Sequence, residues 1–374
     1  MPDHIEVDVL IAGGGPAGAA AALSLQKAGK SVMLIHRGSA SPFLVGETLP
    51  PGAMPFLQEL GVHLSPSEHL PCCGIRSMWG SGEVQTQDFI FQPFGVGYHL
   101  DRKLFDAQLL EAAVQQGAQV LTPASVLQTQ RVETHWETQV QYQQQFRVVK
   151  SSWLIDATGR ARKLSRILKR EAYFLDEMSA FYAMLEEPAH EDLDDFTSLE
   201  AVENGWWYTA RLANNRRIVA FHSELSLLQT LAIKKPSHFF ELLNKTQWIG
   251  PLVNKAGYQK TIGLKSTSAN TSLNLGLPIP GMLAAGDALM TFDPLSGQGI
   301  TNAFYTGILA GKTIVNETSD RETALKDYSD AISTVYSLYL RRLHTAYGAE
   351  SRWPGSVFWQ KKVRQLEAVI VQAT

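Results

Sequence analysis

Cysteine is scarce in this chain of 374 residues: its two cysteines, Cys72 and Cys73, are adjacent. Neighbouring residues rarely have the geometry that a disulfide requires, and two thiols are too few for the framework of a small secreted protein. The sequence therefore predicts two buried free thiols in a reducing compartment. A redox role for the pair is not favoured.

Basic runs and long apolar segments are absent as well. The formal net charge is −3, and no cluster of lysine and arginine marks a surface for nucleic acid or anionic lipid. No apolar run is long enough to span a bilayer, and the first residues, MPDHIE, have neither a basic region nor an apolar signal core. We expect a cytoplasmic protein without a nucleic-acid, membrane or metal partner.

Glycine, by contrast, is concentrated near the N-terminus in the stretch GGGPAG. An apolar strand predicted over residues 6–12 precedes this stretch, and a predicted helix and a second strand follow it, which is the order of a βαβ unit. Gly13, Gly15 and Gly18 have the GxGxxG spacing, in which glycines permit a tight turn, close approach of a pyrophosphate and close helix packing. The loop predicts a dinucleotide with its phosphates at the helix N-terminus.

The second strand, predicted over residues 31–35, ends in His36 and Arg37. Loops of this type usually have an acidic residue near that point, and its carboxylate accepts hydrogen bonds from the ribose hydroxyls. A neutral imidazole can accept only one hydrogen bond, whereas a basic pair could indicate the 2′-phosphate of NADP. The local sequence leaves these alternatives open.

Three further stretches bear on the choice of cofactor. They are DATGR at residues 156–160, Asp101-Arg102 at the start of a helix predicted over residues 101–116, and LAAGDALMTFDPLSGQGITNAF at residues 283–304. Together with the glycine-rich loop, they resemble the FAD-dependent monooxygenase and halogenase group that has the p-hydroxybenzoate hydroxylase fold. The resemblance covers nearly the whole chain. It implies FAD, because NADP dehydrogenases do not need the late Gly-Asp segment.

The resemblance also implies where the cofactor lies. Asp287 would bind the ribityl hydroxyls, and residues 294–299 would follow the pyrimidine edge of the flavin, with the positive end of the next helix directed at N1 and the C2 oxygen. Arg102 is expected near the flavin or the pyrophosphate, and Val126 near the adenine. For DATGR, a plain strand-end turn is nearly as well supported as contact with FAD. The predicted cofactor-binding residues are Gly13, Gly15, Pro16, Ala17, Gly18, His36, Arg37, Glu47, Thr48, Arg102, Val126, Asp156, Gly159, Gly286, Asp287, Pro294, Gly297, Gly299 and Ile300.

A second GxGxxG motif is absent, so no separate nicotinamide domain is expected. Electrons would come from transiently docked NAD(P)H, from an external flavin reductase or from the substrate system itself. We also expect loose binding of FAD, because His36 replaces the carboxylate that normally holds the ribose. Loss of a charge-assisted hydrogen bond costs about 1–3 kcal/mol.

The character of the sequence changes after residue 170. Segments with alternating or aromatic residues predict a mostly antiparallel sheet. The expected fold class is α/β, with a doubly wound FAD-binding domain of the glutathione reductase and p-hydroxybenzoate hydroxylase type, an inserted substrate domain and a helical C-terminus. The expected boundaries are 1–75, 98–170 and 278–330 for the FAD-binding domain, 76–97 and 171–277 for the substrate domain, and 331–374 for the C-terminal helical segment.

Two motifs narrow the branch of flavoproteins. VGETLPPGAMPFLQELGV, residues 45–62, looks like a loop of flavin-dependent halogenases and their relatives, and it would place Glu47 and Thr48 beside the isoalloxazine. The stretch GWWY contains Trp206 and Trp207, where halogenases have a Trp-x-Trp-x-Ile-Pro box. On a strand the two indoles point to opposite faces, so at most one lines a substrate pocket. Packing is favoured over a substrate role: one indole would pack between this sheet and the FAD-binding domain, and the other would cover a surface.

The chain departs from the halogenase pattern in two places. The box continues without Ile-Pro, and no lysine stands between Lys30 and Lys103, where halogenases place the lysine that handles hypohalous acid. The whole-chain pattern most resembles the flavoprotein group of LodB and GoxB, which accompany quinoprotein amino-acid oxidases. This resemblance implies hydroxylation of a tryptophan in an oxidase precursor, of the glycine or lysine oxidase type, during formation of cysteine tryptophylquinone.

Two alternative functions remain open. A small-molecule aromatic hydroxylase or a tryptophan halogenase-like enzyme would act on a free substrate. An FAD-binding maturation chaperone would bind the precursor and use FAD only structurally. The sequence does not identify a catalytic base.

Overall fold

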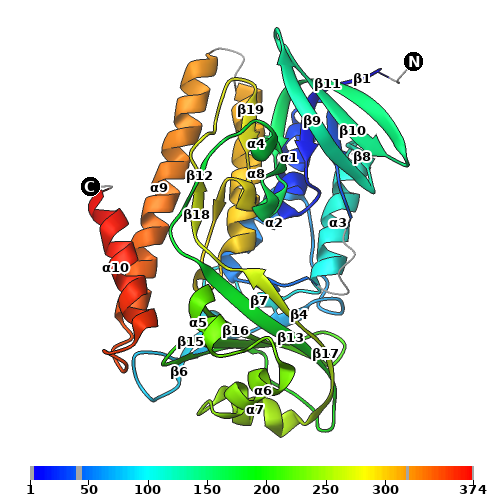
Figure 1. The fold of residues 1–374 in the computed structure, drawn as a ribbon. Coiled ribbons are helices and arrows are strands. Elements are labelled where there is room, and N and C mark those ends of the chain that lie inside the picture. Colours follow the sequence, from blue (N-terminus) through cyan, green and yellow to red (C-terminus); the bar gives the residue numbers. More distant parts are fainter. Residues whose placement is uncertain (1–3, 39–43, 317–319, 373–374) are drawn as a thin grey trace.

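The first large sheet has parallel strands at its centre. The computed structural model describes residues 4–38, 44–316 and 320–372, and this sheet has the order β8-β2-β1-β11-β10-β9, with β19 also beside β11 (Figure 1). Strands β8, β2, β1, β11 and β19 pair in parallel, and the hairpin of β9 and β10 extends the sheet in antiparallel. The bounds are β1 (His4–Ala12), β2 (Val32–Ile35), β8 (Gln119–Leu121), β9 (Ala124–Val132), β10 (His135–Tyr142), β11 (Gln145–Asp156) and β19 (Met282–Ala284).

The parallel strands end at a common edge. Ala12 of β1 is the register partner of both Ile35 of β2 and Asp156 of β11, and Asp156 is in turn paired with Ala284 of β19. Ligands of doubly wound sheets bind at the carboxyl ends of the strands, so the segments that follow these residues are the candidates for ligand binding.

Two helices with small residues pack closely beside this sheet. They are α1 (Pro16–Lys27) and α8 (Gly299–Asn316), and α1 also packs against α3 (Arg102–Gln115). A Cβ atom on Gly307 of α8 would lie 2.4 Å from the carbonyl oxygen of Ala17, so the absence of a side chain lets the backbones approach. The close contact sets α8 along α1, and both helices begin near the glycine-rich loops.

The second large sheet forms the other half of the molecule. Its order is β17-β13-β16-β15-β14-β5-β6, and all pairs are antiparallel except β14 with β5. Helices α6 and α7 lie against it at the bottom of Figure 1. The bounds are β5 (Gly74–Met78), β6 (Gln85–Asp88), β13 (Met178–Pro188), β14 (Phe196–Val202), β15 (Gly205–Leu212), β16 (Arg216–Glu224), β17 (Tyr258–Ser268), α5 (Leu225–Thr230), α6 (Pro236–Asn244) and α7 (Ile249–Ala256).

Two small sheets and several short helical segments, among them α2, α4, η3 and η5, complete the connections between these parts. One sheet has the order β3-β7-β4 and the other β12-β18-β20. The bounds are β3 (Thr48–Leu49), β4 (Leu70–Cys72), β7 (Gly97–His99), β12 (Ala172–Phe174), β18 (Ser272–Asn274), β20 (Met290–Thr291), α2 (Met54–Leu60), α4 (Lys163–Ile167), η3 (Gly159–Ala161) and η5 (Pro294–Ser296).

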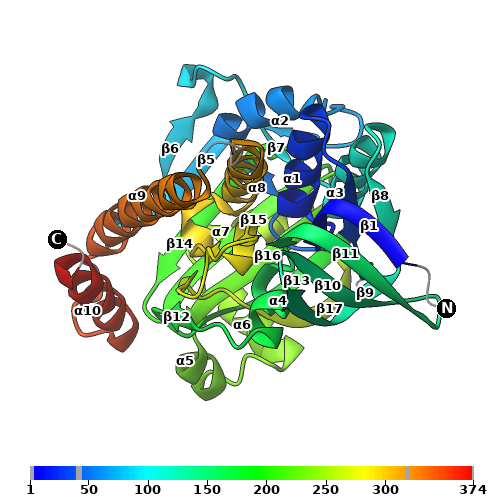
Figure 2. The ribbon, with the colours of Figure 1, turned by 90° about the horizontal axis from the view of Figure 1, so that it is seen from above.

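The C-terminal part is a pair of helices on one side of the molecule (Figure 2). They are α9 (Arg321–Gly348) and α10 (Val357–Gln372), which pack against each other, and α9 also packs against α8. Phe358, Trp359 and Leu366 of α10 are buried in the main hydrophobic core. Helix α10 therefore closes the core of this chain.

The predicted architecture is confirmed: a doubly wound sheet, a second and mostly antiparallel sheet, and a helical C-terminal part are all present. The helix expected over residues 101–116 is α3, and the Asp101 carboxylate accepts hydrogen bonds from the backbone N–H groups of Lys103 and Leu104.

Cys72 and Cys73 are free, but Cys73 is only half-buried. The exact domain boundaries stay a prediction. No helix in residues 4–38, 44–316 and 320–372 is long and apolar enough to cross a membrane.

The contact between α1 and α8 generates a stability prediction. Gly307→Ala would place a methyl group against the backbone of α1, and we expect the free energy of unfolding to fall by about 1–3 kcal/mol. Gly348→Ala is the control, because nothing lies within 4 Å of a Cβ at this helical position. Urea titrations of both variants should show a loss only for Gly307→Ala, and equal stability would contradict the packing argument.

Candidate functional site

The glycine-rich loop after β1 is shaped for an anion. A Cβ on Gly13 would lie 2.0 Å from the carbonyl oxygen of Ala157, and one on Gly18 would lie 1.9 Å from that of Gly13. Gly15, in contrast, has nothing within 4 Å of a Cβ position, and it precedes α1 without a side-chain cap. Since Pro16 has no N–H, the remaining N–H groups of the first turn face this open side, as a pyrophosphate requires.

The segment after β19 lies directly on the start of α1. A Cβ on Gly286 would lie 2.8 Å from the Cβ of Ala17, and the Gly286 N–H donates to the Thr306 hydroxyl oxygen at 2.8 Å. Asp287 follows, and its carboxylate lies 3.4 Å from Nε of Arg160. The DATGR and Gly-Asp segments, far apart in the sequence, are therefore joined at this edge of the sheet.

A second helix N-terminus opens beside this segment. Gly297 has a φ of +61° and Gly299 begins α8, and no atom lies within 4 Å of a Cβ position at either glycine. Pro294 is exposed, whereas Ile300 is buried and anchors the first turn. The turn leaves backbone N–H groups and a positive partial charge unobstructed, which suits the pyrimidine edge of a flavin.

Asp156 serves the fold of the strand-end turn. Its carboxylate accepts the hydroxyl and backbone N–H of Thr158 at 2.6 and 3.2 Å, and those of Ser165 at 2.8 and 2.9 Å. This buried carboxylate has its hydrogen bonds within the turn, which favours the turn interpretation over contact with FAD. Gly159, with a φ of +65°, begins the short η3 helix.

The residues at the end of β2 differ in exposure. The imidazole of His36 packs on the glycine-rich loop, since a Cβ on Gly14 would lie 2.7 Å from its Cγ. Burial lowers the pKa of His36, and Arg37 lowers it further, while Asp106 opposes the shift. The ring is therefore neutral at pH 7. Arg37 is exposed, and Val126 is buried in β9.

These features together fit FAD. Two helix N-termini and a glycine-lined backbone edge converge on the carboxyl ends of the parallel strands. The donor set consists of backbone N–H groups, which bind phosphate and carbonyl oxygens, and the Asp287 carboxylate, which can accept hydroxyl protons. Among the described residues, no group of His, Cys, Asp and Glu could hold a metal ion.

Glu47 lies immediately before β3, in an enclosed polar contact with strand β15 of the second sheet. Only 3% of this residue is exposed, and the Tyr208 hydroxyl donates to its Oε1. The Tyr208 hydroxyl is also 2.7 Å from the hydroxyl of Thr48. Burial raises the pKa of Glu47, although the hydrogen bond from Tyr208 and the charge of Arg102 oppose this. Its Oε2 has no hydrogen-bond partner within the described part of the chain.

Arg102 braces the loop that carries Glu47. Its Nη1 donates to the carbonyl oxygens of Val45 and Gly46 at 2.8 and 3.0 Å, and its Nε donates to Asp106 at 3.1 Å. The sequence placed this arginine near the flavin or the pyrophosphate. In the structure, its hydrogen bonds position the loop expected beside the isoalloxazine.

A chain of polar groups continues from Thr48 into the interior. The Thr48 and Thr197 hydroxyls are 3.3 Å apart, and Thr197 is 2.9 Å from Nε2 of His99. Burial, with a contribution from Arg217, lowers the pKa of His99 to about 3. The imidazole of His99 is therefore neutral. The hydrogen-bonded series that runs from His99 to Glu47 through Tyr208 thus contains no charged group besides the Glu47 carboxyl.

Both indoles of the GWWY strand are buried. Trp206 stacks on His222 with ring centroids 3.8 Å apart, and its Nε1 donates to the Tyr347 hydroxyl at 3.1 Å. Trp207 lies on the opposite face and packs against Phe221 and Phe239. The expectation that one indole covers a surface is wrong, because α6 and its neighbours enclose Trp207. These contacts favour packing roles for both tryptophans.

Tyr208 is the residue of this strand that sequence reasoning missed. It shares a face of β15 with Trp206, because side chains alternate along a strand. It is the last residue of the GWWY motif, in which the two indoles are the stronger aromatic signal. Its position two residues after Trp206 is the signal in the sequence that could have identified it, because this spacing puts a polar aromatic side chain on the same face as Trp206.

Known proteins resemble this chain over most of its length. Residues 6–172 match the FAD binding domain family, and the cofactor is FAD. The chain is 30% identical over 361 residues to LodB of Marinomonas mediterranea, described as an FAD-dependent oxidoreductase, and the alignment covers 95% of this chain and 96% of LodB.

Two solved structures illustrate the shared fold. The myxobacterial chondrochloren halogenase CndH has a TM-score of 0.84 at 18% identity, and the alignment covers 98% of this chain and 90% of the CndH chain. QhpG, a peptidyl tryptophan dihydroxylase essential for tryptophylquinone cofactor biogenesis, has a TM-score of 0.77 at 20% identity. The alignment covers 96% of this chain and 78% of the QhpG chain.

His36 provides a prediction about the strength of FAD binding. His36→Glu should lower the Kd for FAD about tenfold, because a carboxylate can accept charge-assisted hydrogen bonds from both ribose hydroxyls. Arg37→Gln is the control, since it makes the same change in charge one residue away. Fluorescence titration of the apoproteins with FAD measures both. Unchanged or weaker binding by His36→Glu would show that the imidazole does not limit affinity.

Glu47 provides a prediction about pH dependence. Because the folded-state pKa is raised, the folded protein holds a proton that the unfolded chain releases, so stability falls as pH rises above the ordinary pKa of glutamate. Glu47→Gln removes this loss. Relative to the wild type, Glu47→Gln should therefore become more stable as the pH rises from about 5 to about 8.

Denaturant titrations of the apoproteins at the two pH values test this expectation. Glu83→Gln is the control, because Glu83 is exposed. The same stability difference between Glu47→Gln and the wild type at both pH values would contradict a raised pKa at Glu47.

Proposed function

Because this chain belongs to the LodB family of FAD-dependent oxidoreductases, we propose that it is a monooxygenase that hydroxylates a tryptophan side chain in a partner precursor protein. The partner would be the precursor of a quinoprotein amino-acid oxidase, of the glycine or lysine oxidase type. The hydroxylation would be a step in the biosynthesis of its cysteine tryptophylquinone cofactor.

The observation that carries this proposal is the full-length match to LodB, which leaves 4% of LodB outside the alignment. The motifs of this chain point to the same group, which accompanies quinoprotein oxidases. The fold similarity to QhpG, whose substrate is a peptidyl tryptophan, adds support from a protein at 20% identity.

A halogenase activity is less well supported, although CndH has the same fold. The span between Lys30 and Lys103 contains no lysine, so no amine from this span can carry an activated halogen. The strand after Trp207 continues as Tyr208, Thr209 and Ala210, without the Ile-Pro of the halogenase box.

The chemistry divides between the cofactor and the protein. Bound FAD supplies the activation of O₂, with electrons from NAD(P)H, an external reductase or another donor. In the net reaction, one oxygen atom is inserted into a C–H bond of the indole, which becomes C–OH, and the other oxygen atom leaves as water with two electrons and two protons from the donor and solvent. The protein must bind the flavin and the indole in a fixed arrangement and exclude bulk water.

Glu47 is the group of this chain that we propose holds a proton at the site. Its raised pKa favours the protonated carboxyl, and its Oε2 is buried without a hydrogen-bond partner in the described segments. Tyr208 orients the carboxyl through Oε1, and Thr48 fixes the Tyr208 hydroxyl in turn. A carboxyl held in this way can donate a proton where negative charge develops.

Mass spectrometry of the precursor tests the proposed reaction. We expect that an unmodified quinoprotein oxidase precursor, incubated with this protein, FAD, O₂ and a reductant, gains oxygen at one tryptophan. Omission of the reductant and a precursor with phenylalanine at that position are the controls, and neither should gain oxygen there.

Other outcomes of the same assay would replace the proposal. Tight binding of the precursor without any change in mass would indicate a maturation chaperone. Hydroxylation or halogenation of free indoles, with the precursor unchanged, would indicate a small-molecule enzyme.

A further inference from the structure

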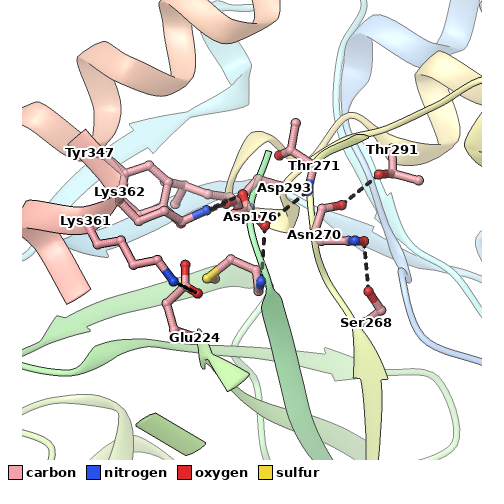
Figure 3. A network of polar contacts seen from close by, with 12 residues as sticks. Asp176, Glu224, Ser268, Asn270, Thr271, Thr291, Asp293, Tyr347, Lys361 and Lys362 are labelled. Atoms are coloured by element: carbon pink, nitrogen blue, oxygen red, sulfur yellow. Dashed lines mark hydrogen bonds and ion pairs between the residues drawn. The ribbon is translucent and has the colours of Figure 1, made fainter. Parts of the chain in front are cut away.

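Lys362 is a buried lysine that joins three distant parts of the chain. It projects from α10 toward Asp176 and Asp293 (Figure 3). Only 1% of its side chain is exposed. Its Nζ donates to Oδ2 of Asp176 at 2.8 Å and to Oδ2 of Asp293 at 3.0 Å. Asp176 precedes β13 of the second sheet, and Asp293 lies immediately before the residues expected at the flavin edge.

A buried ion cluster of this kind needs further hydrogen bonds to offset its desolvation. The Tyr347 hydroxyl donates to Oδ2 of Asp293 at 2.9 Å, and the backbone N–H groups of Met178 and Thr271 donate to Asp176 at 3.1 and 3.3 Å. Burial alone would lower the pKa of Lys362, but Asp293 and Asp176 raise it above its usual value. The ammonium group therefore stays charged.

Asp293 connects this cluster to the loop that begins α8. Its Oδ1 accepts the backbone N–H of Leu295 at 3.0 Å and caps η5, while its own N–H donates to the Tyr339 hydroxyl at 2.7 Å. One carboxylate oxygen thus shapes residues 294–296, and the other is held by Lys362 and Tyr347. The position of the loop is coupled to α10 through a single side chain.

The cluster also reaches the GWWY strand. The Tyr347 hydroxyl that donates to Asp293 accepts the Trp206 Nε1–H at 3.1 Å. The neighbouring lysine on α10 has a different partner: Lys361 donates to Glu224, at the end of β16, at 2.8 Å. Figure 3 shows the two lysines on separate carboxylates, so α10 has one ionic contact with the flavin loop and another with the second sheet alone.

We propose that Lys362 is a positioning residue of the flavin site. By holding Asp293, it fixes the loop at residues 294–299 and the first turn of α8, whose positive end stabilises negative charge on the reduced flavin. The C-terminal helix is then part of the cofactor site without touching the cofactor. This inference rests on the proposed placement of the flavin beside residues 294–299.

A charge-matched double variant tests the inference. Lys362→Met combined with Asp176→Asn removes one cation and one anion, so the net charge of the cluster is unchanged while Asp293 loses its ammonium partner. We expect the Kd for FAD to rise about tenfold. The flavin midpoint potential should become more negative, and the visible flavin spectrum should change.

The control is Lys361→Met combined with Glu224→Gln, which removes the neighbouring ion pair of the same helix. It should leave the midpoint potential and the flavin spectrum as in the wild type. A purely structural role for Lys362 would lower the stability of the apoprotein but leave the potential and spectrum of the bound flavin unchanged, and that result would overturn the inference.

Tyr347→Phe decides the question if the Lys362 variant does not fold. It removes one hydrogen bond to Asp293 and retains the ring, and a smaller change of the potential in the same direction is expected. An unchanged potential would overturn the inference.

Gly299→Val separates the inference from the placement of the flavin. It fills the open space at the start of α8 and should weaken FAD binding. If Gly299→Val changes FAD binding and the flavin potential but the Lys362 variant does not, Lys362 does not position the flavin site. If neither variant changes them, the flavin does not lie beside residues 294–299, and the inference about Lys362 is wrong as well. The proposed tryptophan hydroxylation is tested separately, on the precursor.

Discussion

The common end point of the parallel strands is the constraint on which the rest of this structure depends. Backbone pairing sets Ile35, Ala12, Asp156 and Ala284 side by side, so the chain leaves four strands at one edge. The segments that follow must share a small space. They do so because glycines there remove side chains that would overlap neighbouring carbonyl groups. The anion-binding backbone surface is a consequence of that crowding.

The second sheet is joined to the first half of the molecule by polar side chains as well as by packing. Glu47 immediately precedes β3 and Thr48 begins it, whereas Tyr208 and Thr197 come from strands of the second sheet. Their hydrogen bonds are buried, where an unmade bond is costly, so the two halves are held in one relative arrangement. A site that lies between them is therefore preorganised.

Sequence reasoning succeeded where the signal is local. The spacing of Gly13, Gly15 and Gly18 predicts a loop whose form depends only on the adjacent strand and helix. Asp101 likewise predicts the start of α3, because its carboxylate accepts hydrogen bonds from N–H groups of the next few residues. It failed where function depends on long-range contacts. The partners Asp293 and Lys362 are 69 residues apart, and no periodicity in either segment reveals their contact. The burial of Trp207 likewise depends on helices that follow it in the chain.

The ion pair between Asp293 and Lys362 also imposes an order on the formation of the protein. Synthesis proceeds from the N-terminus, so a ribosome releases residues 294–299 well before Lys362, and the loop has no ionic anchor until α10 folds back along α9. The glycine-rich loop, in contrast, needs only strands formed by the first 156 residues. The strands beside the glycine-rich loop are thus available early in translation, whereas the ionic anchor of residues 294–299 becomes available only late.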